Sequence, residues 1–481
     1  MAEAPHRVQP DPRRSPMEQA KFLKGNLLRH ITVMSLTSSV GLMAVFAVDF
    51  IDMVFIAMLG KEELAAAVGY AGAILFFTTS FNIGIAIAAG ALVARALGAG
   101  ESVLARQQAS NALIWGGIFS AIFALVIWFN LASLVALLGA KGRALDLAVA
   151  YLQIIVPTLP LLLMGMAGGA ILRAHGDARR AMMATIAGGV VNAALDPILI
   201  FGFDLELIGA AWASAASRVA VAVFALGPIF RHHGGLERPP FALFVAGLAP
   251  IFAISFPAIL TQLATPVGQA FVTRAMAEFG EEAVAGMAVI ARMSPLAFGT
   301  IFALSGAIGP IVGQNYGAGN FDRVRRAFWD ALLFTGLFVV AVTAILFVLR
   351  APIAALFDAQ GTALSLIYLF CGPLALAFFF NGAIFVANAS FNNLGHPFHS
   401  TWLNWGRHTI GTIPLVWIGA HFFGAPGALI GQAVGGVIFG LFAIWLARRV
   451  IAEVEARGGA PKGPGLFQRQ ARQIILAFSR R

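Results

Sequence analysis

One unit of sequence occurs twice in this chain. Residues 90–114 read GALVARALGAGESVLARQQASNALI, and residues 309–333 read GPIVGQNYGAGNFDRVRRAFWDALL. Gly90 begins the first copy and Gly309 begins the second, 219 positions later, and the same offset joins Gly176 to Gly395. A chain with such an internal repeat is expected to fold as two equivalent units. If the units are built in a membrane, the site for a transported compound is expected between them.

The composition places both units in a membrane. Apolar residues make up 59% of the chain, charged residues 11%, and the mean hydropathy is +0.85, whereas a soluble domain carries roughly 25% charged residues. Because backbone polar groups in lipid must pair within one segment, the apolar stretches are predicted to be helices, each long enough to cross a core of about 30 Å. We predict an all-α membrane protein with twelve transmembrane helices in two pseudo-symmetric six-helix lobes. The predicted spans are residues 31–59, 67–97, 110–139, 146–172, 181–202, 207–230, 247–277, 284–315, 327–357, 362–393, 399–423 and 425–447.

The distribution of basic residues predicts the orientation of these spans. Lys and Arg gather at both termini and in every second connection, which by the positive-inside rule places the termini in the cytoplasm and the protein in the inner (plasma) membrane. The net charge of +10 is therefore explained by topology, and no nucleic-acid partner is expected. The predicted parts are a cytoplasmic basic N-terminal segment (1–30), an N-lobe (31–231), a cytoplasmic linker (232–246), a C-lobe (247–447) and a cytoplasmic basic tail (448–481).

The ends of the chain and its single cysteine carry weaker signals. The first thirty residues contain no apolar core, so no cleavable signal peptide is expected. Cys371 stands alone inside an apolar span, which excludes a disulfide framework. Residues 466–481 mix apolar residues with arginines, and both an interfacial helix and a disordered tail are compatible with this pattern.

Two pairs of polar residues interrupt the spans of the first half. A charge inside a span costs about 2.5–3.5 kcal/mol on insertion scales and by default indicates a functional site. Asp49 and Asp52 are three positions apart and share a helix face, where both cannot ionise cheaply, so we expect them to hold a proton or share a cation. Asn192 and Asp196 are four apart, and Pro197 frees a backbone carbonyl one turn earlier. This arrangement suits H⁺ or Na⁺; the alternative is a permanent hydrogen bond between helices.

The second half repeats the spans without repeating the acids. Val272 stands where the repeat aligns with Asp52. The C-lobe spans contain Arg274, Arg292 and Arg407 instead. These arginines suit snorkelling to an interface, anionic substrate groups or backbone carbonyls, and our first interpretation is snorkelling or structural pairing.

Motifs for enzymatic chemistry are missing from the sequence. We find no phosphate-binding loop, zincin motif or nucleophile elbow, so neither a cofactor nor ATP as energy source is expected. The 41 phenylalanines are compatible with a cavity for flat, lipophilic cations, and equally with a lipid-facing surface.

Several stretches in order resemble the multidrug and toxic compound extrusion (MATE) family along essentially the whole chain. They are LRAHGDARRAMMATIAGGVVNAALDPILIFG (172–202), GAAWASAASR (209–218), VDFIDMVFIAMLG in the first span and the paired GAG loops. The resemblance implies two lobes in an inverted V around a central cleft. It also implies export of drugs or metabolites, with no enzymatic activity, in exchange for H⁺ or Na⁺ by a monomer in the lipid bilayer.

The resemblance also assigns roles to residues. Asp52 matches the family's first-helix Asp, and Asn192 and Asp196 match its fifth-helix pair. Ser214 stands where the family often has Thr in the sixth helix. Together they resemble the N-lobe proton or sodium site, and Asp49, one turn from Asp52, extends it.

The chain departs from the family pattern in three places. NorM-like members carry a Glu and an Asp where this chain has Thr265 and Asn381, which puts a C-lobe cation site in doubt and favours the DinF-like branch. Many members have a proline early in the first helix that bends on protonation, but Thr37 occupies this position, although Pro257 is its repeat partner. Flexibility of the first helix must then come from other residues.

These observations together predict a secondary antiporter that works by alternating access and exports organic, lipophilic, cationic compounds in exchange for H⁺ or Na⁺. A flippase for a lipid-linked precursor is the main alternative. An intramembrane enzyme lacks a visible nucleophile or metal set, and a channel is disfavoured because the acids do not form a ring.

Overall fold

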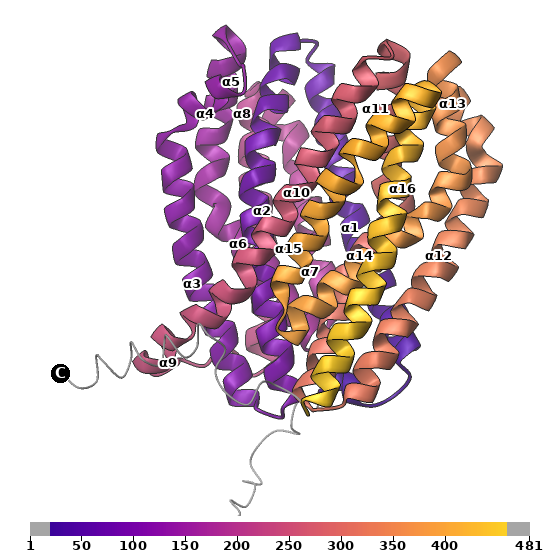
Figure 1. Cartoon of the computed structure of the whole chain (residues 1–481). Helices are drawn as coiled ribbons and strands as arrows, with labels where there is room; N and C mark the ends of the chain where they lie inside the picture. Colours follow the sequence, from indigo (N-terminus) through magenta and orange to yellow (C-terminus); the bar gives the residue numbers. More distant parts are fainter. Residues whose placement is uncertain (1–19, 459–481) are drawn as a thin grey trace, which may run out of the picture.

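The structure of the chain is a computed structural model that describes residues 20–458. In this range the protein is helical and contains no strand (Figure 1). The suggested interfacial helix over 466–481 and the first nineteen residues lie outside the described residues.

The N-lobe elements follow one another as a set of long helices, some of them divided by short 3₁₀ or π segments. They are η1 (Lys21–Leu23), α1 (Leu27–Met58), α2 (Glu62–Gly98), α3 (Ser102–Phe129), α4 (Leu131–Leu137), α5 (Gly142–Ile155), η2 (Val156–Thr158), α6 (Leu159–Ala174), α7 (Ala178–Pro197), η3 (Ile198–Gly202) and α8 (Glu206–His232).

The C-lobe repeats this arrangement after a short linker helix, α9 (Phe241–Ala246), which packs against α3 through a hydrogen bond from Trp115 Nε1 to the Phe244 carbonyl (3.0 Å). The C-lobe elements are α10 (Leu248–Ala277), α11 (Glu281–Gly317), α12 (Phe321–Leu356), α13 (Gly361–Leu369), η4 (Phe370–Leu374), α14 (Ala375–Leu394), α15 (Pro397–Gly406), η5 (Arg407–Gly411) and α16 (Ile413–Ala456).

Eleven helical segments of the described chain are long and apolar enough to cross a membrane. The last of them, Pro397–Ala456, is 60 residues long, about 90 Å at the rise of an α-helix, and cannot cross a bilayer only once. Gly424 breaks it with φ 64° and ψ −149°, and the chain then runs back along itself. The backbone pairs in closest approach along the two arms are Gly411–Gly435, Leu415–Gly431 and Gly419–Gly427.

This antiparallel spacing explains why eleven apolar helical segments correspond to twelve transmembrane helices. Each step of four residues on one arm matches a step of four in the opposite direction on the other, as expected for two helices joined by a tight turn. The prediction of twelve transmembrane helices in two lobes is confirmed. Some boundaries were wrong. The third span, predicted as 110–139, is the helix Ser102–Phe129, and the last span, predicted to end at 447, ends at Ala456. Polar residues at these ends are helical although they are not hydrophobic.

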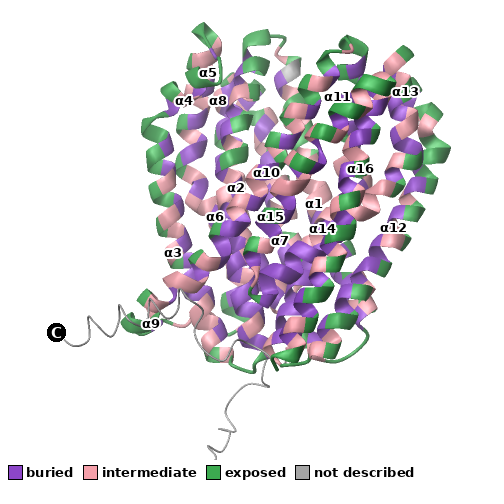
Figure 2. Ribbon diagram, in the orientation of Figure 1, coloured by how far each residue is buried: buried purple, intermediate pink, exposed green. Residues whose placement is uncertain are grey.

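The two lobes meet at one end of the molecule, which we call the base: the end formed by residues 20–26 and the loops 99–101, 175–177 and 318–320. A Cβ on Gly98 would lie 2.0 Å from the Gln314 carbonyl oxygen, and one on Gly317 would lie 2.0 Å from the Arg95 carbonyl oxygen. Only glycine permits helices to approach so closely. In Figure 2 buried residues accordingly concentrate in the lower centre of the molecule.

The first helix packs with both lobes. Its early residues Leu27, Ile31 and Met34 lie in one buried cluster with residues of α11, α12, α14 and α16 of the C-lobe. Its later part packs along α7 of the N-lobe, where Gly189 faces Val48. α1 is therefore a helix of the N-lobe whose beginning is anchored in the C-lobe.

Candidate functional site

The exposed residues of α1 fall on two different faces. Leu36, Val40, Ala47, Phe50 and Val54 recur at spacings of three, four and seven and form an apolar stripe, which is the pattern of a lipid-facing surface. Asp49 and Met53, also exposed, are four positions apart on a second face. The carboxyl group of Asp49 therefore lies on a different face of α1 from the apolar stripe.

Asp52 lies at the side of that face, where α1 packs against α7. Asp52 is half-buried, and its Oδ1 accepts a hydrogen bond from Asn192 Nδ2 at 3.0 Å. Asn192 Nδ2 also donates to Asp196 Oδ2 at 2.6 Å. One amide group thus joins two carboxyl groups that belong to different helices and are far apart in sequence.

Asp196 is the most enclosed member of this cluster. Its side chain is 0% exposed, and its Oδ1 has no hydrogen-bond partner. Asp52 and Asp196 are thus held next to each other by the same amide group. α7 ends at Pro197, and the π-helical turn Ile198–Gly202 follows; such turns are frequent at functional sites.

Ser214 reaches the cluster through a residue that the sequence did not single out. Ser214 on α8 lies next to Tyr151 on α5, and Tyr151 is also near Asp52 and Asp196. Next to it, Arg218 donates to the carbonyl of Ile155 and to Thr158 Oγ1, both at 2.9 Å. A tyrosine in an apolar span resembles ordinary lipid-facing aromatics, so only its neighbours in the fold identify it.

The structure therefore brings together four of the five predicted residues and separates one. Asp52, Asn192, Asp196 and Ser214 line one polar cluster of α1, α7 and α8, with Tyr151 between them. Asp49 makes no hydrogen bond or ion pair with another described residue and is exposed beside them. We call Asp52, Asn192, Asp196, Ser214 and Tyr151 the acidic cluster, and Asp49 is its exposed neighbour.

The corresponding region of the C-lobe is apolar. Val272, the repeat partner of Asp52, is 0% exposed and belongs to a core cluster of α10, α11, α13 and α16. Thr265 is exposed, whereas Asn381 is half-buried with an unpartnered Oδ1. No hydrogen bond links these two residues in the described chain. α1, in turn, passes through Thr37 as an uninterrupted helix.

The three C-lobe arginines lie in different surroundings. Arg274 is exposed in the last turn of α10, and Arg407 is half-buried at the start of the π turn η5. Arg292 is exposed, yet its Nη2 is 3.8 Å from Met53 Sδ of α1. It therefore stands between the lobes.

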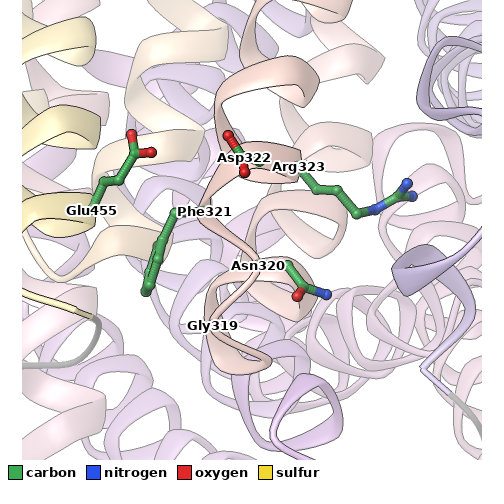
Figure 3. A pocket seen from close by; sticks show the side chains of 6 residues that line it. All are labelled: Gly319, Asn320, Phe321, Asp322, Arg323 and Glu455. Atoms are coloured by element: carbon green, nitrogen blue, oxygen red, sulfur yellow. The ribbon is translucent and has the colours of Figure 1, made fainter.

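A pocket at the base is unrelated to the acidic cluster. It has a volume of about 290 Å³ and is lined by Gly319, Asn320, Phe321, Asp322, Arg323 and Glu455 (Figure 3). Arg325 bridges Asp322 and Glu455 beside it, at 2.6 and 3.0 Å. The pocket lies where the loop after α11 meets the end of α16, and exposed ion pairs of this kind contribute little to stability.

Comparison with known proteins gives one family for this chain. The family profile MatE matches residues 38–198 and 257–418, one stretch in each lobe. A protein of Shewanella oneidensis described as a FAD transporter is 27% identical over 90% of this chain and 97% of its own length. The multidrug export protein MepA of Staphylococcus aureus is 25% identical over 67% of this chain and 72% of its own length.

Solved structures show the same fold. The MATE transporter VcmN of Vibrio cholerae has a TM-score of 0.83 at 26% identity, covering 89% of this chain and 97% of that one. A structure described as the outward-facing conformation of a multidrug resistance MATE family transporter has a TM-score of 0.85 at 22% identity, covering 92% of this chain and 100% of that one.

Proposed function

Because the chain belongs to the MatE family of membrane transporters, we propose that it is a secondary antiporter that exports organic compounds in exchange for H⁺ or Na⁺. The observation that carries the coupling proposal is the contact of Asn192 with both Asp52 and Asp196. A buried carboxyl pair on two helices changes its net charge when a proton or Na⁺ binds, and so changes the packing of those helices.

The path from ion binding to the lobes runs along α1. Its acidic end contacts α7, and its first turns lie in the C-lobe core. Movement of α1 against α7 therefore acts on the contact between the lobes. We propose that the ion binds the two conformations with different affinity, which is the only thermodynamic requirement for coupling by alternating access.

The orientation that we propose puts the base in the cytoplasm. The positive-inside rule supports this, since the described basic residues Lys21, Lys24, Arg29, Arg323 and Arg326 all lie at the base. The protein would then be a monomer in the inner membrane, closed toward the cytoplasm in the present conformation. The N-lobe, linker and C-lobe boundaries predicted above belong to the same proposal.

The relatives guide the choice of substrates to test. MepA is described as a multidrug export protein and the Shewanella relative as a FAD transporter. The solvent-exposed carboxyl group of Asp49 would attract lipophilic cations to the space between the lobes. We therefore expect this chain to transport such cations, with ethidium as a convenient probe.

The test is transport in proteoliposomes with an imposed pH gradient and, separately, a Na⁺ gradient. Wild-type protein should move ethidium under one of the two gradients, and Asp52→Asn should reduce the rate at least about ten-fold, because the variant cannot change charge. Asp146→Asn, which alters an exposed carboxyl group of α5 outside the cluster, is the matched control. Full gradient-driven transport by Asp52→Asn would disprove the coupling role.

A further inference from the structure

One face of α11 is built from small residues that touch the N-lobe. Gly299, Gly306 and Gly313 are seven positions apart and so lie on the same side of the helix. A Cβ on Gly299 would lie 2.0 Å from Met43 Cε of α1, and one on Gly313 would lie 2.9 Å from Ala94 Cβ of α2. This row of glycines is the C-lobe side of the contact between the lobes.

Arg292 occupies the next position of this row, seven residues before Gly299. The helix has a non-helical residue at Phe298, but Arg292 still faces the N-lobe, because its Nη2 is 3.8 Å from Met53 Sδ. Arg292 is exposed, and Met53 is 40% exposed on the same face of α1 as Asp49. The guanidinium group therefore reaches from the C-lobe to the N-lobe and remains accessible.

Snorkelling does not account for this position. Arg292 is eleven residues from the start of α11 at Glu281, about 16 Å along the helix axis. Arg274, by contrast, lies in the last turn of α10, where its head group reaches the interface. No carboxylate among the described residues forms an ion pair with Arg292, so a charge has been placed between the lobes without a protein counter-ion.

A second guanidinium group faces the same row of glycines nearer the base. A Cβ on Gly306 would lie 3.5 Å from Arg173 Nε of α6. Arg173, like Arg292, has no ion pair with a carboxylate in residues 20–458. Arg173 belongs to the N-lobe, so each lobe contributes one guanidinium group to the region where the lobes face each other, and the acidic cluster pairs with neither of them.

We propose that Arg292 is a substrate-binding residue that donates hydrogen bonds to the phosphate or carboxylate of an organic anion. A guanidinium group offers planar, paired donors that match these groups, and its charge cannot be removed by deprotonation. The transporter then takes compounds that carry an anionic group as well as the lipophilic cations favoured by Asp49. This proposal rests on the transport function above, but it is tested by equilibrium binding, which does not depend on coupling.

The experiment uses pairs of compounds that differ by one phosphate: riboflavin with flavin mononucleotide, and adenosine with adenosine monophosphate. Binding to the full chain in nanodiscs is measured by calorimetry. Wild-type protein should bind at least one phosphorylated compound about ten-fold or more tightly than its partner, the effect of a charge-assisted hydrogen bond. Arg292→Gln should abolish this preference, Arg292→Lys should retain part of it, and Arg274→Gln should leave it unchanged.

Three results would overturn the proposal: equal affinity for both members of each pair in the wild type, no binding of either phosphorylated compound, or a preference that survives in Arg292→Gln. Thermal melting shows whether each variant is folded. If Arg292→Gln does not fold, the comparison of Arg292→Lys with the wild type decides, because lysine keeps the charge and loses the paired donors. A phosphate preference that depends on Arg292, combined with normal transport by Asp52→Asn, would disprove only the coupling role.

Discussion

Asn192 is an uncharged residue whose amide group hydrogen-bonds two carboxyl groups. Its Nδ2 donates to Asp52 at 3.0 Å and to Asp196 at 2.6 Å, so both carboxyl groups are oriented by one amide that cannot itself titrate. Asp196 Oδ1 still has no partner, and an enclosed acceptor of this kind is costly unless a proton, a water or a cation satisfies it. This unpartnered oxygen supports the ion-binding role that we propose for the acidic cluster.

Asp177, which precedes α7, gives a prediction about pH at the same scale. Burial by itself raises the pKa of Asp177, but hydrogen bonds from His233 and Arg180 outweigh it and hold the pKa well below its usual range. A carboxyl group whose pKa is lower in the folded state stabilises the fold above its unfolded pKa, about 3.9, and this contribution is lost as the pH falls further. We expect the melting temperature of the wild type to decline below about pH 4 and Asp177→Asn to show a flatter decline.

The control for this prediction is Asp358→Asn, which removes an exposed carboxyl group from a loop of the C-lobe. Its melting curve should follow that of the wild type between about pH 7 and about pH 3. Identical pH profiles for the wild type and Asp177→Asn would contradict the assigned role, since asparagine keeps the helix cap but cannot carry the charge that His233 and Arg180 contact.

Among the elements, the last two transmembrane helices depend most on glycine. The arms before and after Gly424 approach backbone to backbone at three successive levels. In lipid no hydrophobic effect drives helices together, so close van der Waals packing of small residues must do it. The tight turn has a further requirement, because φ of 64° with ψ of −149° is a conformation essentially restricted to glycine.

Gly431→Val is expected to destabilise this hairpin. A Cβ at this position would lie 2.1 Å from the Leu415 carbonyl oxygen, and a backbone atom cannot move aside as a side chain does, so a cost of about 1–3 kcal/mol or more is expected. The melting temperature in detergent measures it. Gly227→Ala in α8, where nothing lies within 4 Å, is the control and should be neutral or slightly stabilising. Equal melting temperatures for the two variants would refute the close approach.

For the whole molecule, the decisive feature is the seal at the base. Phe22 is 1% exposed; its amide donates to Gln314 Oε1 at 2.9 Å, and its carbonyl accepts from Arg323 Nη2 at 2.9 Å. Gln314 also donates to the Ala174 carbonyl of the N-lobe at 2.8 Å. The segment before α1 thus adds to the direct contact of Gly98 and Gly317 and connects both lobes.

Phe22→Ala is expected to loosen this seal and to populate a conformation with the base open. Spin labels on Glu101 and Asn320, exposed in the loops of the two lobes, would report it as a shift toward longer distances in pulsed electron paramagnetic resonance. Phe241→Ala, which truncates a phenylalanine that is 81% exposed, is the control with the same chemical change. An unchanged distance distribution in Phe22→Ala would mean that the glycine contacts alone hold the base closed.

Much of the architecture could be predicted from the sequence for simple physical reasons. A segment of about twenty apolar residues has no stable alternative to a helix in lipid, so the number of spans follows from hydropathy, and the repeat divides them into two lobes. The cost of a charge in a span is likewise a property of composition, and it marks Asp52 and Asp196 as candidate site residues. The sequence also placed the break between the last two spans at residue 424, where the structure has the reversal. The end of the third span could not be placed in this way, because hydropathy does not report helix ends or close packing.

Local composition and spacing within single segments therefore predict the membrane environment, the two six-helix lobes and the costly polar residues. Which of those residues meet depends on how the helices pack. Asn192 reaches Asp52 across 140 positions, Tyr151 joins the cluster, and Arg292 faces the N-lobe while Arg274 does not. These contacts depend on the rotation and depth of each helix against its neighbours, which packing between segments sets and no single segment encodes.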